Sequence, residues 1–392
     1  QRDYARIMYS SSFRRLQGKM QLLGIKNDQF FRNRLTHSLE VAQIARSIAG
    51  TIQYDSAESY IVEAGALAHD LGNPPFGHAG ERHLNKLFAD IGGFEGNAQT
   101  LRILTNIEKK RPSFRGLNLT YRSMLSVVKY FNKFDVEKFK KDEKGQKFIY
   151  DDDYELLYKF IKENDIKVRT IDVQIVDIAD EIAYAAHDLE DGLRVKAFTI
   201  DEVLHDYKAQ FGNSDCYNIF EENVKSAQEK AGYGIDKMDS TQYSKLFRQE
   251  LASRLINLAL NDIDLMPVTN EMIDKTGTMQ KEELGFLSYG ELIHGLKDIV
   301  FKCINHNDEV YHYERNGERV LDFLVELYTK ENMYLPPEYR VKELMSQYPD
   351  LKDNDEKRLQ KRLICDYIAG MMDSYAISTY EKFSGKKFGS EH

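Results

Sequence analysis

Apolar residues recur every three or four positions along most of this chain, and this spacing constrains its fold more than any other feature. Near the N-terminus, Leu35, Leu39, Ala42 and Ile48 fall on one side of an expected helix. The sequence has only seven prolines in 392 residues, so few positions would interrupt such helices. Alternating apolar and polar residues, which would indicate a strand or hairpin arm, occur in one short candidate at 147–150. We therefore predict an all-α fold, a single large globular array of packed helices.

The same periodicity returns later in the chain, with polar stretches between the periodic segments. The periodic segments are 175–189, 251–259, 321–328 and 364–372. The polar stretches, which we expect to be solvated loop or helix insertions, are 135–165, 205–245 and 262–285. No repeat, low-complexity tract or clear linker divides the chain, so we predict one domain over 1–392.

Charge and cysteine usage narrow the possible partners and the cellular compartment. A net charge of -9 argues against a surface that coats nucleic acid broadly. The three cysteines, Cys216, Cys303 and Cys365, lie far apart and are expected to be free thiols in a reducing environment. No stretch approaches the roughly 18 apolar residues that a membrane helix needs, and the first residues lack an apolar signal core. We expect a cytoplasmic protein without a membrane partner.

An apolar, helix-like run ends in two adjacent metal-type ligands, His69 and Asp70, just before a Gly/Pro turn. A buried aspartate is costly unless it is paired or binds a metal. A further candidate ligand, His37, lies upstream. Mixed nitrogen and oxygen ligands suit Mn, Fe, Co, Ni or Zn better than an all-oxygen Mg or Ca site. The sequence therefore predicts one divalent metal site, which suits cleavage of phosphate esters or anhydrides.

The carboxylates downstream offer a fourth ligand, but spacing alone does not choose among them. Asp180, Tyr184 and Asp188 are spaced to share one stripe of a helix, which could be a pocket wall or a solvated acidic face. The competing acids are Asp172, Asp177, Asp180, Glu181, Asp188, Glu190 and Asp191.

A second polar pair follows the Gly/Pro turn. His78 and Glu81 are three positions apart on an expected helix, so they share a face. A carboxylate can orient an imidazole that moves a proton at neutral pH. The alternative is a surface pair at a helix start, where the helix dipole favours Glu. Their position shortly after His69 and Asp70 favours the catalytic interpretation. We interpret the other histidines as structural; they are His83, His187, His205, His294, His306, His312 and His392.

Several motifs follow one another in a distinctive order. They are SSFRRLQ at 11–17 with Lys19 and Gln21, RLTHSLEVA at 34–42, HDLGNPPFGH at 69–78 with Gly80 and Glu81, FEGNAQ at 94–99, GLNLTY at 116–121, ADEIAY at 179–184 with DLED at 188–191, and DYIAGM at 366–371. In this order the chain resembles the deoxyguanosine-triphosphate triphosphohydrolases (dGTPases) of the HD-domain phosphohydrolase superfamily. The motifs span nearly the whole chain.

The resemblance implies an HD-domain fold with a metal-binding core at about 30–195 and a packed C-terminal helical region at about 196–392. It implies one divalent metal, with Mn as the first choice and Mg, Co or Ni as alternatives. It further implies hydrolysis of deoxynucleoside triphosphates, dGTP first among them, to deoxynucleoside and inorganic triphosphate by attack at the α-phosphorus. The implied metal ligands are His37, His69, Asp70 and Asp180, and the implied catalytic pair is His78 with Glu81.

The resemblance also assigns substrate contacts. Gln21, Tyr184 and Asp188 would surround the deoxyribose, with Tyr184 closing off the 2′ side. Phosphates would be held by Arg34, by Lys129 and by a C-terminal basic residue, Arg362 or Arg358. Asn118 matches a motif near the site. The family often has a second Asp where this chain has Glu181, and we expect this change to spare the metal site.

Family resemblance implies partners as well. Homo-oligomers, including hexamers, are common in this family, and some members respond to nucleotide or single-stranded DNA effectors. Two other functions stay open: a phosphohydrolase of nucleoside monophosphates or cyclic nucleotides, and a non-catalytic nucleotide-sensing module.

Overall fold

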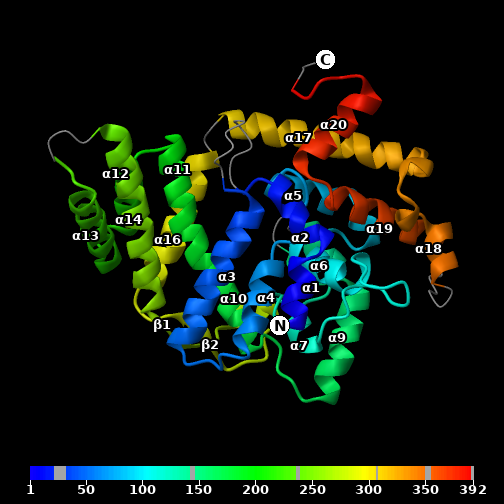
Figure 1. The fold of residues 1–392 in the computed structure, drawn as a ribbon, viewed down its shortest axis with the longest axis horizontal. Coiled ribbons are helices and arrows are strands. Elements are labelled where there is room, and N and C mark those ends of the chain that lie inside the picture. Colours follow the sequence, from blue (N-terminus) through cyan, green and yellow to red (C-terminus); the bar gives the residue numbers. More distant parts are fainter. Residues whose placement is uncertain (22–31, 142–145, 235–238, 306–307, 349–354, 390–392) are drawn as a thin grey trace.

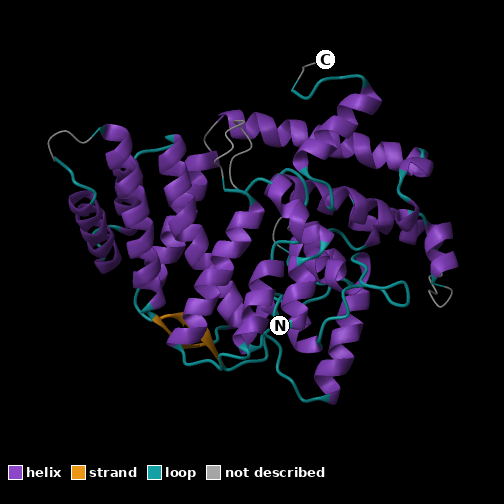
Figure 2. Ribbon diagram, in the orientation of Figure 1, coloured by secondary structure: helices purple, strands orange, loops and turns teal. Residues whose placement is uncertain are grey.

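The computed structural model describes the chain apart from residues 22–31, 142–145, 235–238, 306–307, 349–354 and 390–392. Helices make up most of the described chain, and the strands found there are two short ones (Figure 2). The all-α prediction is confirmed.

Three central helices pack against one another: α3 (Arg34–Thr51), α4 (Ser59–Ala68) and α10 (Ile171–Ala183) (Figure 1). Helix α3 begins with a capping box, in which the Asn33 side chain accepts from the Thr36 amide and the Thr36 hydroxyl accepts from the Asn33 amide. This cap starts the helix three residues before His37.

Further helices come from the first 165 residues of the chain. They are α1 (Arg2–Met8), α2 (Ser11–Arg15), α5 (Gly77–Leu87), α6 (Gly96–Arg102), α7 (Tyr121–Leu125), α8 (Val136–Lys141) and α9 (Asp151–Glu163). The polar stretch 135–165 is therefore largely helical, and Leu157 and Ile161 of α9 are buried in the core.

The second half of the chain forms two groups of helices on either side of the centre (Figure 1). One group, at the left of the view, contains α11 (Leu189–Val195), α12 (Ile200–Phe211), α13 (Asp215–Lys230), α14 (Ser240–Leu260) and α16 (Gly290–Asn305). The other, at the upper right, contains α17 (Asp308–Lys330), α18 (Val341–Gln347), α19 (Glu356–Ala369) and α20 (Asp373–Ser384).

The buried apolar residues gather into two main clusters. The larger one joins the central helices to α12, α13, α14 and α16. The second joins α5 to the C-terminal helices, for example through Leu84, Leu321 and Ile368. The division into an HD core at about 30–195 and a C-terminal region stays a prediction.

The predicted strand at 147–150 is wrong. In this segment the Ile149 amide donates to the Asn132 carbonyl, without a ladder of paired residues. The strands lie instead in the polar stretch 262–285, where β1 (Ile263–Pro267) pairs antiparallel with β2 (Glu282–Phe286). Helix α15 (Asn270–Thr276) lies between the two strands in the chain.

Two expectations from composition can be compared with the described residues. Cys216, Cys303 and Cys365 are all free thiols, as predicted. Across the described parts of the chain, none of the helices has both the length and the apolar composition that crossing a membrane requires.

Candidate active site

The three central helices bring four predicted ligands together. His37 comes from α3, His69 and Asp70 directly follow α4, and Asp180 comes from α10. Ligand atoms of His37, His69 and Asp70 all lie within 4.8 Å of one another. Asp180 is not part of that group of three, but its Oδ1 lies 3.1 Å from His37 Nε2 and 3.4 Å from His69 Nε2. Side chains from remote parts of the chain thus converge on one small volume.

Asp70 is held in place by two neighbours. Arg34 Nη1 donates to its Oδ2 across 2.8 Å, and the Asn73 amide group donates to its Oδ1. Burial alone would raise the pKa of Asp70, but the positive charge of Arg34, followed by that of His69, holds it below its usual range. Asp70 therefore presents a fixed, ionised carboxylate.

The geometry of His69 suits a metal ligand. Its Nδ1 lies 2.6 Å from the Ala66 carbonyl, and a proton on Nδ1 would leave Nε2 with a free lone pair. Nε2 is buried and makes no hydrogen bond within the described part of the chain, although it lies 3.5 Å from Asp70 Oδ1. Burial opposes a second proton, but Asp70 and then Asp180 raise the pKa of His69 to about 9. A divalent cation at this position would take the place of that proton, so these residues fit the metal that the sequence predicts.

His37 and Asp180 complete the ligand group from two different helices, α3 and α10. His37 is fully buried, and its Nδ1 has no partner among the described residues. Burial would raise the pKa of Asp180, but His69 and the hydrogen bond from His37 hold it well below its usual range. The carboxylate is ionised and available to a cation.

Apart from Asp188, the competing acids of the same region have other partners. Asp172 binds Arg122, and Asp177 binds Arg169 at 3.0 Å. Glu181 points to His294, whose Nε2 lies 3.3 Å away. These acids are therefore engaged elsewhere than at His37 and His69. Farther along the chain, Glu190 and Asp191 are likewise engaged, because both pair with Arg32. Ligation by Asp180 stays a prediction that this geometry favours.

Tyr184 and Asp188 lie beside the ligand group, on a helix that is not a regular α-helix. The segment Tyr184–Asp188 is a π-helical turn that follows α10 directly, so the predicted α-helical stripe is interrupted there. The Tyr184 ring still packs on His37, with centroids 5.3 Å apart. Asp188 Oδ1 is buried without a hydrogen-bond partner among the described residues, and burial raises the pKa of Asp188 well above its usual range. Such an atom is suited to receive a polar ligand.

Gln21 and Asn118 differ sharply in their surroundings. Gln21 is buried, and neither its amide nitrogen nor its amide oxygen has a partner among the described residues. Asn118 is exposed, has a positive φ of 52°, and accepts a hydrogen bond from Arg6 through its carbonyl. The unsatisfied amide of Gln21 is the one that fits a buried ligand contact.

The two predicted phosphate cations near the site already have carboxylate partners. Arg34 is buried against Asp70, and Lys129 forms an ion pair with Asp177. Burial opposes the charge on Lys129, but Asp177 raises its pKa well above the usual range. A phosphate would have to share these cations with Asp70 and Asp177.

Arg362 makes contacts of another kind. Its two terminal nitrogens donate to the carbonyls of Gly93 and Ile91, at 3.0 and 2.9 Å, and its guanidinium lies 4.1 Å from the Tyr150 ring centroid. The other candidate, Arg358, is exposed at the start of α19. None of these contacts involves the ligand group, and a phosphate-binding role for either residue stays a prediction.

His78 and Glu81 form the pair that their spacing predicts. His78 Nδ1 lies 3.3 Å from Glu81 Oε2, and the His78 side chain is 53% exposed. Burial would raise the pKa of Glu81, but Lys147, followed by His78, holds it far below its usual range. The imidazole therefore faces a permanent negative charge on one side and is open to solvent on the other.

The turn before His78 is held by both ends of the chain. The buried ammonium of Lys19 donates to the carbonyls of Asn73 and Ala369. The Phe76 amide, at a residue with φ of 64°, donates to Asp373 Oδ1 at 3.2 Å. Burial, followed by the charge of Arg15, lowers the pKa of Lys19 to about 7.

Close approaches link this turn to the ligand group. A Cβ at Gly77 would lie 3.7 Å from Arg34 Nη2. A Cβ at Gly80 would lie 2.0 Å from the Pro75 carbonyl, so only glycine permits this tight turn. The start of α5, which carries His78, is thus packed against the residue that holds Asp70.

Sequence reasoning assigned no role to Asn73 or Lys147. Asn73 had a signal, because it follows Asp70 at a spacing from which an amide can reach back to the carboxylate. Lys147 had none, because its partners Glu81 and Glu95 lie 66 and 52 positions away in the chain.

Comparison with known proteins gives two family matches. Residues 34–185 match the HD domain, and residues 288–382 match the phosphohydrolase-associated domain. The first match begins at Arg34 and ends just after Tyr184, so it contains all four predicted ligands.

Three similar proteins match over nearly their full lengths. "Deoxyguanosinetriphosphate triphosphohydrolase-like protein 2" of Vibrio cholerae is 43% identical over 98% of this chain and 88% of its own. The protein of the same name in Deinococcus radiodurans is 34% identical over 99% and 93%. A "deoxyguanosinetriphosphate triphosphohydrolase-like protein" of Rickettsia felis is 32% identical over 100% and 92%. With its helical fold and its histidine–aspartate group, the chain belongs to the deoxyguanosinetriphosphate triphosphohydrolase-like proteins, a family of HD-domain phosphohydrolases.

Proposed function

We propose that this protein hydrolyses deoxynucleoside triphosphates, dGTP first among them, to a deoxynucleoside and inorganic triphosphate. The observation that carries the proposal is the buried group of His37, His69 and Asp70, whose ligand atoms lie within 4.8 Å, with Asp180 in contact with both imidazoles. The names of the relatives support the substrate class.

The ligand group would hold one divalent cation through His37, His69, Asp70 and Asp180. Manganese is our first choice from the family resemblance, and a mixed nitrogen and oxygen donor set is compatible with it. Mg, Co and Ni are the alternatives that the resemblance offers. When bound, such a cation supplies the positive charge that polarises an α-phosphate oxygen and stabilises the charge that develops there.

His78 would move the protons. Its Nδ1 faces Glu81, which leaves Nε2 to exchange a proton with the reacting groups. In the proposed reaction, a water oxygen bonds to the α-phosphorus while the bond from that phosphorus to the 5′-oxygen breaks. The water loses a proton and the leaving 5′-oxygen gains one, so the products are a deoxynucleoside and an intact triphosphate.

The remaining predicted contacts would position the substrate. Gln21 and Asp188 each offer the deoxyribose a buried polar atom that has no partner among the residues the structure describes, and Tyr184 would close off its 2′ side. Arg34 and Lys129 would hold phosphates in exchange for part of their contacts with Asp70 and Asp177. Asn118 and Arg362 are assigned to the substrate by resemblance alone.

The test is chromatography of the products from the four dNTPs and GTP with Mn²⁺. Triphosphate and deoxynucleoside in equal amounts support the proposal. Monophosphate with pyrophosphate would overturn it, because the bond between the α-phosphorus and the 5′-oxygen would then stay intact and a bond within the polyphosphate would be the one that breaks. Turnover confined to nucleoside monophosphates or cyclic nucleotides would support the alternative phosphohydrolase. Tight dNTP binding without product would support a nucleotide-sensing module.

We also propose that the protein acts in the cytoplasm as a homo-oligomer, with a hexamer as the first arrangement to test. Light scattering coupled to size exclusion measures the assembly. Adding single-stranded DNA or a second nucleotide to the same product assay tests for an effector.

A further inference from the structure

Lys147 lies between two buried acidic side chains that belong to different helices. Its Nζ lies 3.1 Å from Oε1 of Glu81, on α5, and 2.8 Å from Oε1 of Glu95, the N-cap of α6. The exposed fractions of the two acids are 13% and 2%, so water contributes little to solvating their charges. One ammonium thus bridges two carboxylates and offsets their mutual repulsion in a poorly hydrated place.

The two carboxylate oxygens of Glu81 contact different groups. Oε1 accepts from Lys147 and from the Gly96 amide at 3.2 Å. Oε2 faces Nδ1 of His78 at 3.3 Å. The carboxylate is anchored through one oxygen, and this anchor directs the other oxygen at the imidazole. A neutral His78 that donates to Glu81 must carry its proton on Nδ1 and present Nε2 to a substrate.

Glu95 fixes Lys147 in turn. Its second oxygen accepts from the Ala98 amide at 2.8 Å, and its first accepts from the Asn97 side chain at 2.8 Å. Glu95 is therefore locked to the start of α6. Without the ammonium, the carboxylates of Glu81 and Glu95 would repel each other, and Glu95 has more fixed donors to hold it. Glu81 is the one that would move or take up a proton.

We propose that Lys147 is a positioning residue that acts through Glu81, because its ammonium holds the Glu81 carboxylate in the orientation that keeps the free nitrogen of His78 directed at the substrate. The kinetic part of this inference rests on the proposed function. Its structural part, the orientation and tautomer of His78, does not.

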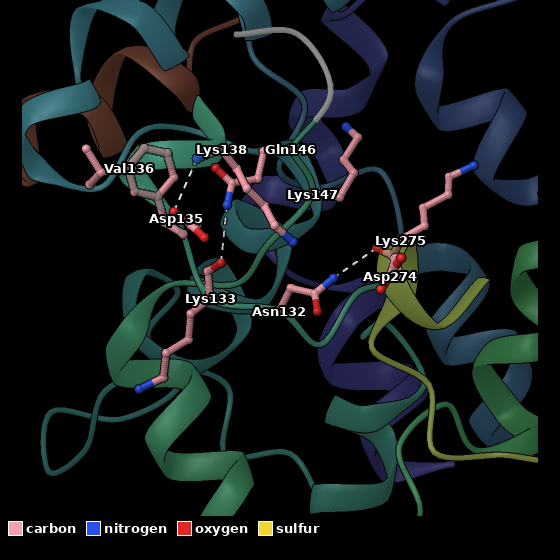
Figure 3. A pocket seen from close by; sticks show the side chains of 10 residues that line it. Asn132, Lys133, Asp135, Val136, Lys138, Gln146, Lys147, Asp274 and Lys275 are labelled. Atoms are coloured by element: carbon pink, nitrogen blue, oxygen red, sulfur yellow. Dashed lines mark hydrogen bonds between the residues drawn. The ribbon is translucent and has the colours of Figure 1, made fainter. Parts of the chain in front are cut away.

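The chain provides a matched control in Lys133. Lys133 and Lys147 both border a pocket of about 680 Å³, and Figure 3 shows their side chains leading in different directions from it. Lys133 pairs with the exposed Glu155 and has no contact with Glu81. Replacing either lysine by methionine removes one positive charge from the border of this pocket, but only the replacement of Lys147 removes a contact of Glu81.

The kinetic experiment compares Lys147→Met, Lys147→Arg and Lys133→Met in steady-state hydrolysis of dGTP with Mn²⁺. We expect Lys147→Met to lower kcat by about 10-fold or more, with KM within about twofold of the wild type. Lys147→Arg should restore most of the rate, and Lys133→Met should leave it unchanged. A raised KM with unchanged kcat would overturn the inference, since Lys147 would then bind substrate instead. An unchanged rate in Lys147→Met would overturn it too.

A double-variant cycle tests whether Lys147 acts through Glu81. If it does, adding Lys147→Met to Glu81→Gln lowers kcat no further. Fully multiplicative losses contradict the inference. Where Lys147→Met does not give a folded protein by circular dichroism, Lys147→Gln replaces it in every comparison.

The tautomer experiment needs no turnover. Nitrogen-15 NMR of histidine-labelled protein with Mg²⁺ distinguishes the two neutral tautomers of His78, and the His78→Gln variant assigns its signal. We expect the Nδ1–H form in the wild type and in Lys133→Met, and loss of this preference in Lys147→Met. An unchanged tautomer in Lys147→Met overturns the inference. If the wild type releases no triphosphate from any dNTP, the proposed function fails while this result still decides the role of Lys147.

Discussion

Arg34 and Asp70 form a buried ion pair, with 2.8 Å between Nη1 of the guanidinium and Oδ2 of the carboxylate. Removing one partner of such a pair leaves an uncompensated charge and typically costs about 3–5 kcal/mol. We therefore expect Arg34→Met to lower the free energy of unfolding of the metal-free protein by about this amount, measured by urea denaturation with a chelator present. Mn²⁺ should restore part of the loss, because it would compensate Asp70.

Arg46→Met is the control for this prediction. Arg46 lies on the same helix, α3, but its side chain is 64% exposed in its pair with Glu63. An exposed pair contributes about 1 kcal/mol at most. If both variants lost the same free energy of unfolding, burial would not make the Arg34–Asp70 pair more stabilising than the exposed Arg46–Glu63 pair.

Asp180→Asn should weaken Mn²⁺ binding by more than about 100-fold. Loss of a residue that only hydrogen-bonds to a metal ligand typically weakens binding by roughly 10- to 100-fold, and loss of a ligand should weaken it more. The reason is that Asp180 touches both imidazoles, whereas its neighbour Glu181 turns to His294. Titration calorimetry measures the dissociation constants. Glu181→Gln is the matched variant and should bind Mn²⁺ like the wild type. If Glu181→Gln lost more affinity than Asp180→Asn, the predicted ligand would be the wrong acid.

His78→Ala should reduce kcat for dNTP hydrolysis by about 100-fold or more while the protein keeps its metal. His78 is exposed and lies opposite Glu81, outside the ligand group, so its loss removes a proton-transfer group only. Metal content is measured by mass spectrometry alongside the rate. His83→Gln, on the same helix and paired with Asp322, serves as the control. A near-normal rate in His78→Ala would remove His78 from the mechanism.

Metal removal should make stability fall with rising pH. Asp70 and Asp180 raise the pKa of His69 from 6.5 to about 9 when no cation is bound. A raised pKa contributes stability that is complete below pH 6.5 and is lost as the pH rises through about 9. We expect chelator-treated protein to lose a few kcal/mol over this window, measured by urea denaturation at several pH values. His69→Gln should lack this loss, and an identical slope in both proteins would rule out His69 as its source.

The helices and the ligand group could be predicted because their signals are local or repeated. Spacing identified α3, although it placed Leu39 inside when Leu39 is 48% exposed and Ala49 is buried. The pair His69 and Asp70 stood out because an apolar run precedes it. His37 could be proposed as a further ligand from the sequence, but the choice of Asp180 among the downstream acids followed only from the family resemblance, since 143 positions separate it from its contact His37.

What could not be predicted depends on long-range charge pairing. The hairpin β1–β2 was missed because one of its inward residues is a glutamate, Glu283, which is 1% exposed and neutralised by Arg169 from another part of the chain. Lys129 was predicted to hold phosphate, and nothing in the local sequence indicated its ion pair with Asp177 of α10. Burial of a charge is decided by its partner, and a partner distant in sequence leaves no local pattern.

The anchoring of the turn before His78 has a consequence for how this protein can be divided. Cutting the chain after α11 would remove Ala369 and Asp373, leaving the Lys19 ammonium with one carbonyl acceptor and the Phe76 amide without its carboxylate. The portion that matches the HD domain would then carry every predicted metal ligand but lack the C-terminal contacts that hold the turn before α5. The last helices thus support the turn that leads to the proposed catalytic pair, and we expect shortening the protein from that end to reduce activity before it reduces metal binding.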